Sequence, residues 1–155
     1  METTLNAGVD SRSRGFRSEI FGLDLEWAPG GMLPDVSVYT PGQVVEETGF
    51  SLDTLRYYER IGLLESIDRN AAGQRRFTQK DVGWLGMIRC LRDTGMPIAE
   101  MLRFAEMTRA GDHTVRERIA LLEAHDRRVQ EQVDNLRERQ VAIRNKIAYY
   151  HSVVD

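Results

Sequence analysis

Arginine, tyrosine and hydroxyl side chains gather between residues 38 and 77 of this 155-residue chain. A guanidinium group presents several N–H donors in a rigid plane, which matches phosphate oxygens and the major-groove edge of guanine. Hydroxyl groups at the start of a helix lie close to its positive dipole end, where phosphate is favoured. The segment therefore predicts contact with nucleic acid. The candidate contact residues are Thr40, Ser51, Thr54, Arg56, Tyr57, Tyr58, Arg69, Arg75, Arg76 and Phe77.

Two short helices must position these side chains. Thr40 followed by Pro41 is typical of a helix start, and Gly49 is typical of the residue after a helix end. Ser51 begins a second helix, which Gly62 ends. Two helices joined by so short a turn predict a helix-turn-helix, whose second helix can enter a DNA major groove.

The second helix should have an inward and an outward face, because residues three and four apart lie side by side. From polarity, we expect the inward face to comprise Leu52, Leu55 and Ile61. The outward face should comprise Arg56, Tyr57, Tyr58 and Arg60.

A basic hairpin, called the wing below (residues 65–77), follows the second helix. Residues 69–73 read as its turn, and residues 74–77 return toward the helices. Three arginines on one small hairpin suit contact with phosphate or with the minor groove. Phe77 can pin the hairpin to the helices.

The order of these elements is similar to that of a known family. The segments YTPGQVVEETGF (residues 39–50), TLRYYERIGLL (54–64) and GQRRF (73–77) closely resemble the winged-helix domain of MerR-type bacterial transcription regulators. The resemblance extends from about Val38 to Tyr150. It implies a mainly α fold, in which a winged helix-turn-helix head precedes a long dimerisation helix that forms an antiparallel coiled coil.

The net charge of -3 does not exclude a nucleic-acid partner, because the excess of acidic residues lies within residues 1–35. Local charge on the binding surface governs affinity more than the total does. The chain has no apolar run of roughly eighteen residues, so no membrane span is expected. It also has no basic-then-apolar signal sequence. We therefore expect a cytoplasmic protein and, by the resemblance, one located in the bacterial nucleoid.

The sequence divides into four parts. We expect residues 1–37 to be a disordered extension, although their aromatic residues also allow a segment that docks on the folded part. Residues 38–111 should form the winged helix-turn-helix DNA-binding domain. Residues 112–150 should form the coiled-coil helix, and residues 151–155 a short tail. Helical periodicity predicts two further helices after the wing, one with Val82, Leu85, Ile88 (or Met87) and Leu91 as its core face.

Apolar residues recur at alternating spacings of four and three from residue 115 to residue 150, with Asp126 and Gln140 as exceptions. A single helix cannot bury such a stripe, and the preceding helices are too short to cover it. A homodimer is therefore predicted, with folding back onto the same chain as the alternative. The predicted dimer seam comprises Val115, Ile119, Leu122, Val129, Val133, Leu136, Ile143 and Ile147.

In an antiparallel pair, facing residues have numbers that add up to a constant. The heptad allows sums of 262 and 269. We expect 262, because its midpoint, residue 131, lies nearest the middle of a helix over residues 112–150.

Sites for catalysis and for metals are not apparent. The sequence has no Gly-rich phosphate loop, no H-E-x-x-H and no nucleophile elbow, so we expect neither an enzyme nor a cofactor. Metal-sensing members of the resembled family need thiolates near the long helix. Here Cys90 is the single cysteine, which we expect to be a small buried residue, and we predict no metal site. The histidines are scattered, and we expect them at the surface. We also expect no attached ligand-binding domain.

Two functions follow from the resemblance. The first is a sequence-specific transcription regulator that binds a palindromic site in double-stranded promoter DNA as a homodimer. Such a protein distorts the spacer DNA so that RNA polymerase can use the promoter. The alternative is an architectural DNA-binding or adaptor protein without promoter activation.

Overall fold

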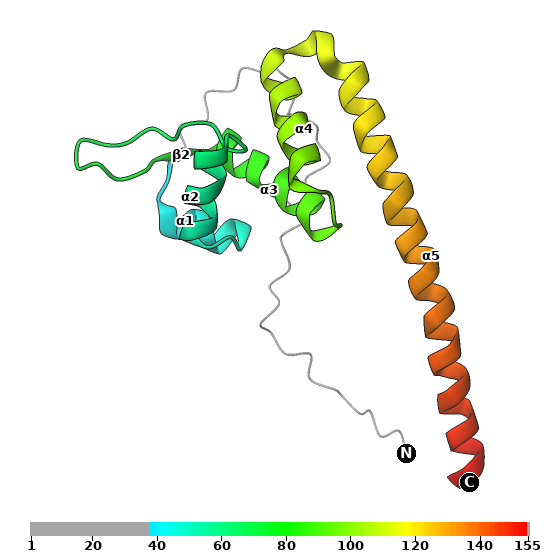
Figure 1. The fold of residues 1–155 in the computed structure, drawn as a ribbon. Coiled ribbons are helices and arrows are strands. Elements are labelled where there is room, and N and C mark those ends of the chain that lie inside the picture. Colours follow the sequence, from blue (N-terminus) through cyan, green and yellow to red (C-terminus); the bar gives the residue numbers. More distant parts are fainter. Residues whose placement is uncertain (1–37, 155) are drawn as a thin grey trace, which may run out of the picture. The chain divides into compact units, whose positions relative to one another are not determined.

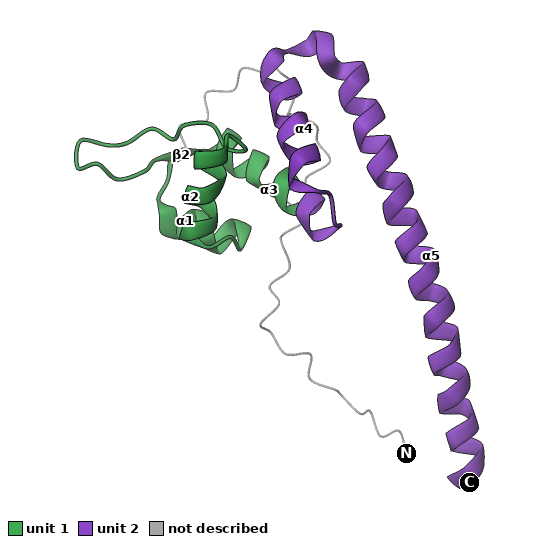
Figure 2. Cartoon of the chain, viewed as in Figure 1, with its two compact units in different colours: residues 1–89 green, residues 90–155 purple. Residues whose placement is uncertain are grey.

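A computed structural model of the chain describes residues 38–154; the expectation for residues 1–37 lies outside the described residues. In chain order the elements are β1 (Val38–Tyr39), α1 (Pro41–Thr48), α2 (Leu52–Ile61), β2 (Phe77–Thr78), α3 (Gln79–Asp93), α4 (Ile98–Ala110), the 3-10 turn η1 (Asp112–Thr114) and α5 (Val115–Val154) (Figure 1). They belong to two compact units, which divide between Arg89 and Cys90 (Figure 2). No helix among the described residues is long and apolar enough to cross a membrane.

Local signals place α1 and α2 as the sequence predicted. The Thr40 hydroxyl accepts a hydrogen bond from the Gln43 amide at 3.3 Å, and the Gln43 side chain accepts one from the Thr40 amide at 2.8 Å. This reciprocal capping box satisfies two backbone donors at the start of α1. Ser51 caps α2 by accepting from the Thr54 amide at 3.1 Å. Gly49 follows α1 in the left-handed conformation, with φ of 71°.

The wing hairpin projects beside α2 and returns into a strand (Figure 1). β1 pairs with β2 antiparallel, so that Tyr39 lies opposite Phe77. The strand at Val38–Tyr39 was not expected, because two residues carry too little pattern to predict a strand. Further out, Arg69 and Arg75 form an isolated antiparallel bridge.

The core of the first unit fixes the orientation of α2. Leu55 and Tyr58 lie three residues apart and are both buried. The Tyr58 ring packs edge-on against Phe50, with centroids 5.4 Å apart. The expected outward position of Tyr58 is therefore wrong, since only 4% of the residue is exposed. The expected inward position of Leu52 is wrong as well: this residue is 42% exposed, at the edge of the buried stripe.

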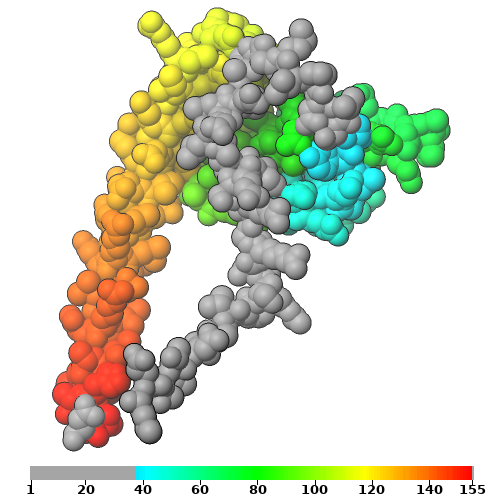
Figure 3. Space-filling model, turned by 180° about the vertical axis from the view of Figure 1, so that it is seen from behind, coloured from blue at the N-terminus to red at the C-terminus, as the bar shows by residue number. Residues whose placement is uncertain are grey.

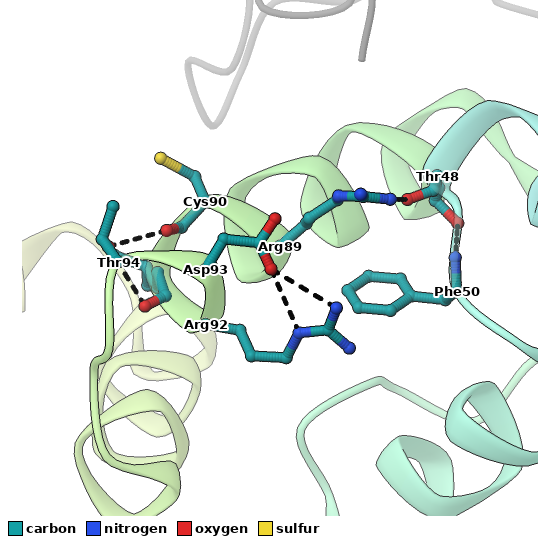
Figure 4. A network of polar contacts seen from close by, with 8 residues as sticks. Thr48, Phe50, Arg89, Cys90, Arg92, Asp93 and Thr94 are labelled. Atoms are coloured by element: carbon teal, nitrogen blue, oxygen red, sulfur yellow. Dashed lines mark hydrogen bonds and ion pairs between the residues drawn. The ribbon is translucent and has the colours of Figure 1, made fainter. Parts of the chain in front are cut away.

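Helix α3 is capped by Thr78 and packs as predicted. The Thr78 hydroxyl accepts from the Asp81 amide, and the Asp81 carboxylate accepts from the Thr78 amide. The predicted core face, Val82, Leu85, Ile88 and Leu91, is buried. The expectation that Cys90 is buried is wrong, because this residue lies one position off that stripe and is exposed (Figure 4).

In the second unit, α4 packs against the first half of α5. Met101, Phe104 and Ala105 of α4 are buried, and so is His125 of α5, which is 6% exposed. His125 Nε2 lies 2.7 Å from the Thr94 hydroxyl. The prediction of a surface histidine is wrong here, because His125 faces α4 rather than solvent.

A charge pair also joins these two helices. Arg128 of α5 donates to both carboxylate oxygens of Glu100 in α4. The hydrogen bond from Arg128 lowers the pKa of Glu100 below its ordinary value. The Arg128 side chain is 44% exposed and the Glu100 side chain 33%. Because water and salt screen such a pair, it adds little stability.

The second half of α5 has no neighbour among the described residues of this chain. Every residue from 134 to 154 is exposed, including Leu136 at 64% and Ile143 at 61%. In the space-filling view this part of α5 runs from orange to red (Figure 3). The alternative in which α5 folds back on its own domain therefore applies only to its first half.

We predict that Gly49→Ala destabilises the chain by about 1–3 kcal/mol, because a non-glycine residue is strained at this positive φ. An added methyl group would also collide with the Arg89 guanidinium, which donates to the Thr48 carbonyl (Figure 4). Urea unfolding followed by circular dichroism measures the effect.

Gly83→Ala is the matched control. It lies inside α3 with open space around its Cβ position and should stabilise by about 0.5–1 kcal/mol. A Gly49→Ala variant as stable as the parent would contradict this account of the α1 end.

Candidate DNA interface

A groove of about 380 Å³ lies between the start of α1, α2 and the wing. Six of the residues predicted from sequence line it: Thr40, Arg56, Arg69, Arg75, Arg76 and Phe77. Residues from 40 to 77 thus meet at one surface of the first unit. The core described above brings them together, since α2 and the wing share the buried side chains Leu55 and Phe77.

The outer face of α2 carries the exposed polar side chains. The Arg56 side chain is 59% exposed, and its Nη1 donates to Asp53 Oδ1 at 3.2 Å. Tyr57 is 41% exposed, and the Arg60 guanidinium lies over its ring at 5.4 Å. An exposed guanidinium can donate to a base edge or to phosphate, whereas a buried one cannot. Arg56, Tyr57 and Arg60 are therefore placed to meet a ligand.

Ser51 and Thr54 lie at the N-terminus of α2, as predicted. Their hydroxyl oxygens are 2.9 Å apart, and the Ser51 oxygen also caps the helix. Both side chains are thus held at the positive end of the helix dipole, close to where a phosphate would be favoured.

The wing arginines differ from one another in their contacts. Arg75 Nε donates to Glu59 of α2 at 2.9 Å, and both side chains are only about a fifth exposed. Arg69 Nη1 donates to the Gly73 carbonyl at 2.8 Å. The Arg76 residue is exposed, and its backbone amide donates to Asp68 across the hairpin. Arg75 therefore anchors the wing to α2, and Arg76 is the better placed for a ligand.

The turn of the wing is held by Asn70. Its side-chain oxygen accepts from the amides of Ala72 and Gln74, at 3.0 and 2.9 Å. Gly73 follows with φ of 77°. Such a local network fixes the turn without a hydrophobic core, which small hairpins lack.

Two predicted contact residues have almost no exposed area. Tyr58 is 4% exposed and Phe77 is 1% exposed, because both side chains fill the core beneath the groove. Polarity misled the assignment of Tyr58, whereas its spacing of three from Leu55 would have placed it correctly. Phe77 does pin the wing, as the sequence also suggested.

Sequence reasoning missed two residues of the interface. Leu52 was assigned to the core but lines the groove, and Asp53, the next residue of α2, was not among the predicted contact residues although its side chain is exposed. Both lie in the first turn of α2, directly after the Ser51 cap. That position was the available signal, because the first turn of a recognition helix is the part that contacts base edges.

No group of three or more His, Cys, Asp or Glu side chains within residues 38–154 could hold a metal ion. The groove is instead lined by the side chains of four arginines, which are hydrogen-bond donors: Arg56, Arg69, Arg75 and Arg76. A helix-turn-helix whose second helix adjoins a basic hairpin defines a winged helix-turn-helix head.

Comparison with known proteins places this head in a family. The family described as MerR HTH family regulatory protein matches residues 39–108. An uncharacterized HTH-type transcriptional regulator of Haemophilus influenzae is 40% identical over 72% of this chain and 83% of its own length. The chain thus belongs to the MerR family.

Solved structures agree with this assignment. The chain is similar to HiNmlR, described as a MerR family regulator lacking the sensor domain and bound to promoter DNA. The TM-score is 0.70 and the identity 39%, over 74% of this chain and 87% of that one. A MerR family transcriptional regulator from Listeria monocytogenes gives a TM-score of 0.67 at 33% identity, over 72% and 85% of the two chains.

We predict that Glu59 and Arg75 stabilise the head jointly. Glu59→Gln, Arg75→Gln and the double variant form a cycle whose coupling free energy should be about 1 kcal/mol, because each charge loses its partner in the single variants. Urea unfolding measures it. A coupling of zero would show that the 2.9 Å contact does not anchor the wing.

Proposed function

We propose that the chain is a transcription regulator that binds a palindromic site in promoter DNA as a homodimer. The observation that carries the proposal is the groove of about 380 Å³, where α2 and the wing present arginines on one surface. Arg56 of α2 would contact base edges in the major groove, and Arg76 of the wing would contact phosphate or the minor groove. The HiNmlR structure with promoter DNA supports this assignment.

The second half of α5 supports a homodimer. Its apolar side chains lie on one stripe and are exposed to solvent in the single chain, which is unfavourable unless a partner covers them. The stripe is shared by every copy of the chain, so an antiparallel pair of α5 helices would bury both at once. A helix of 40 residues is about 60 Å long, so an antiparallel pair places the N-terminal ends of the two α5 helices far apart.

The extent of α5 bears on the register of this pair. The helix runs from Val115 to Val154 rather than over residues 112–150, so its midpoint lies between residues 134 and 135. The register centred on the middle of the helix is therefore the one in which the numbers of facing residues add up to 269, not 262. In that register Val133 faces Leu136 of the second copy, and Asp126 faces Ile143.

We infer further that the dimer acts on the promoter by distorting the DNA between its two half-sites, where RNA polymerase binds. The separation of two rigid heads by a long helix pair suits such a mechanism, since binding both half-sites fixes the DNA path between them. Footprinting on the DNA flanking the coding sequence tests the function. One protected palindromic site supports a regulator, whereas broad or absent protection would contradict it and favour an adaptor.

Replacing the two groove arginines should have separable effects. Arg56→Ala should weaken binding to the protected site by about 1–3 kcal/mol, because a bidentate base contact is lost. Arg76→Ala should weaken binding to all sequences and reduce the slope of log affinity against log salt by about 0.9. Fluorescence anisotropy at several salt concentrations measures both.

Arg127→Ala on the exposed surface of α5 is the control for loss of one positive charge. It should leave both the site affinity and the salt slope close to those of the parent. If Arg56→Ala behaved in the same way, Arg56 would not belong to the reading surface.

Cysteine cross-linking should reveal the arrangement of the dimer. With Cys90 replaced by serine, chains carrying Val133→Cys and Leu136→Cys should form a disulfide when mixed, because these residues face each other at the sum of 269. If chains carrying Val129→Cys and Val133→Cys cross-linked more efficiently than the first pair, the register would be the one whose facing residue numbers add up to 262.

Two further outcomes would contradict the antiparallel dimer. Efficient cross-linking of Ile143→Cys to the same position of the second copy would show a parallel pair. In the antiparallel pair of helices, the two copies of residue 143 are about 25 Å apart. A monomer in sedimentation at micromolar concentration would contradict dimerisation altogether.

A further inference from the structure

An acidic side chain lies on the exposed face of α2, beside Arg56. Asp53 is in the first turn of α2, on the same exposed face as Arg56 and Arg60. Its side chain is 91% exposed, so it contributes nothing to the core. Phosphates repel a carboxylate, and an exposed acid on a DNA-facing helix therefore opposes binding unless it meets a hydrogen-bond donor.

The local structure does not require this carboxylate as a helix cap. Ser51 already caps α2 through its hydroxyl, which accepts from the Thr54 amide at 3.1 Å. Asp53 instead accepts from Arg56 Nη1 through Oδ1 at 3.2 Å. That hydrogen bond uses one carboxylate oxygen, so Oδ2 can accept from another donor. It also holds the Arg56 guanidinium beside the carboxylate.

The major groove offers a match for such a pair. A G·C base pair presents the acceptors N7 and O6 of guanine next to the amino donor N4 of cytosine. A guanidinium donates to N7 and O6 together, and a carboxylate accepts from N4. Neighbouring Arg and Asp side chains thus complement one G·C pair, and the hydrogen bond between them can persist.

We propose that Asp53 and Arg56 together read one G·C base pair in each half-site. Arg56 donates to guanine O6 and N7, while Asp53 Oδ2 accepts from cytosine N4. Asp53 is then a specificity-determining residue: it favours cytosine on the opposite strand and penalises bases that present an acceptor there. The proposal rests on the DNA-binding function proposed above and adds the identity of one base pair.

Selection from a pool of randomised double-stranded DNA tests the proposal with the full-length chain. The parent should select an inverted repeat that has G·C at one position of each half-site. Asp53→Ala should lose discrimination at that position only, on the order of tenfold in relative affinity. Affinity for unrelated DNA should stay the same or rise, because a negative charge is removed.

Asp53→Asn extends the test to a variant with the same shape. An amide presents a donor and an acceptor, the pair that matches N7 and N6 of adenine, so A·T should gain at the same position. Glu131→Ala on the exposed face of α5 controls for the loss of one negative charge and should leave the selected site unchanged. Circular dichroism of each variant checks that the chain keeps the helix content of the parent.

The outcomes separate this proposal from the proposed function. If the parent selects no sequence, both are wrong. If the parent selects a palindrome, and Asp53→Ala and Asp53→Asn select the same bases at every position, the regulator stands and the role of Asp53 is overturned. Uniformly tighter binding by Asp53→Ala with an unchanged selected site would show that the carboxylate only repels DNA.

Discussion

The arrangement of the head depends on the packing of one side of α2 into the core. Leu55 and Tyr58 are buried there, with the Tyr58 ring against Phe50, while Phe77 at the end of the wing is buried in the same unit. Buried aromatic side chains contribute strongly to the stability of a small domain, because each removes a large apolar area from water. It fixes the rotation of α2, so the opposite side, with Asp53, Arg56 and Tyr57, must be exposed. The groove is a consequence of this packing.

The same constraint explains why polar residues at the surface have distinct roles. Arg75 is tied to Glu59 and so holds the wing on α2, whereas Arg56 is exposed and Arg76 lies on an exposed part of the wing. A count of arginines would have treated the three alike. Position relative to the core decides which guanidinium groups can contact a ligand and which support the ones that do.

Much of this could be predicted from the sequence, because short-range signals determine it. Thr40, Ser51, Gly49 and Gly62 each act through backbone groups within a few residues, and their capping roles followed from residue type alone. The heptad of α5 was similarly apparent. What residue type alone could not predict depends on packing: the burial of Tyr58 and His125, and the exposure of Leu52 and Cys90. Residue type favours the opposite environment for each of these four.

The central claim is that α2 enters the major groove of DNA at the site the protein selects. Dimethyl sulfate methylates guanine N7 in the major groove and adenine N3 in the minor groove, so its protection pattern reports directly on the groove that is occupied. The account predicts protection of a guanine N7 in each half-site by the parent chain, and restored methylation there with Arg56→Ala. Guanines that stay reactive throughout the footprint, with protection limited to adenine N3, would contradict it.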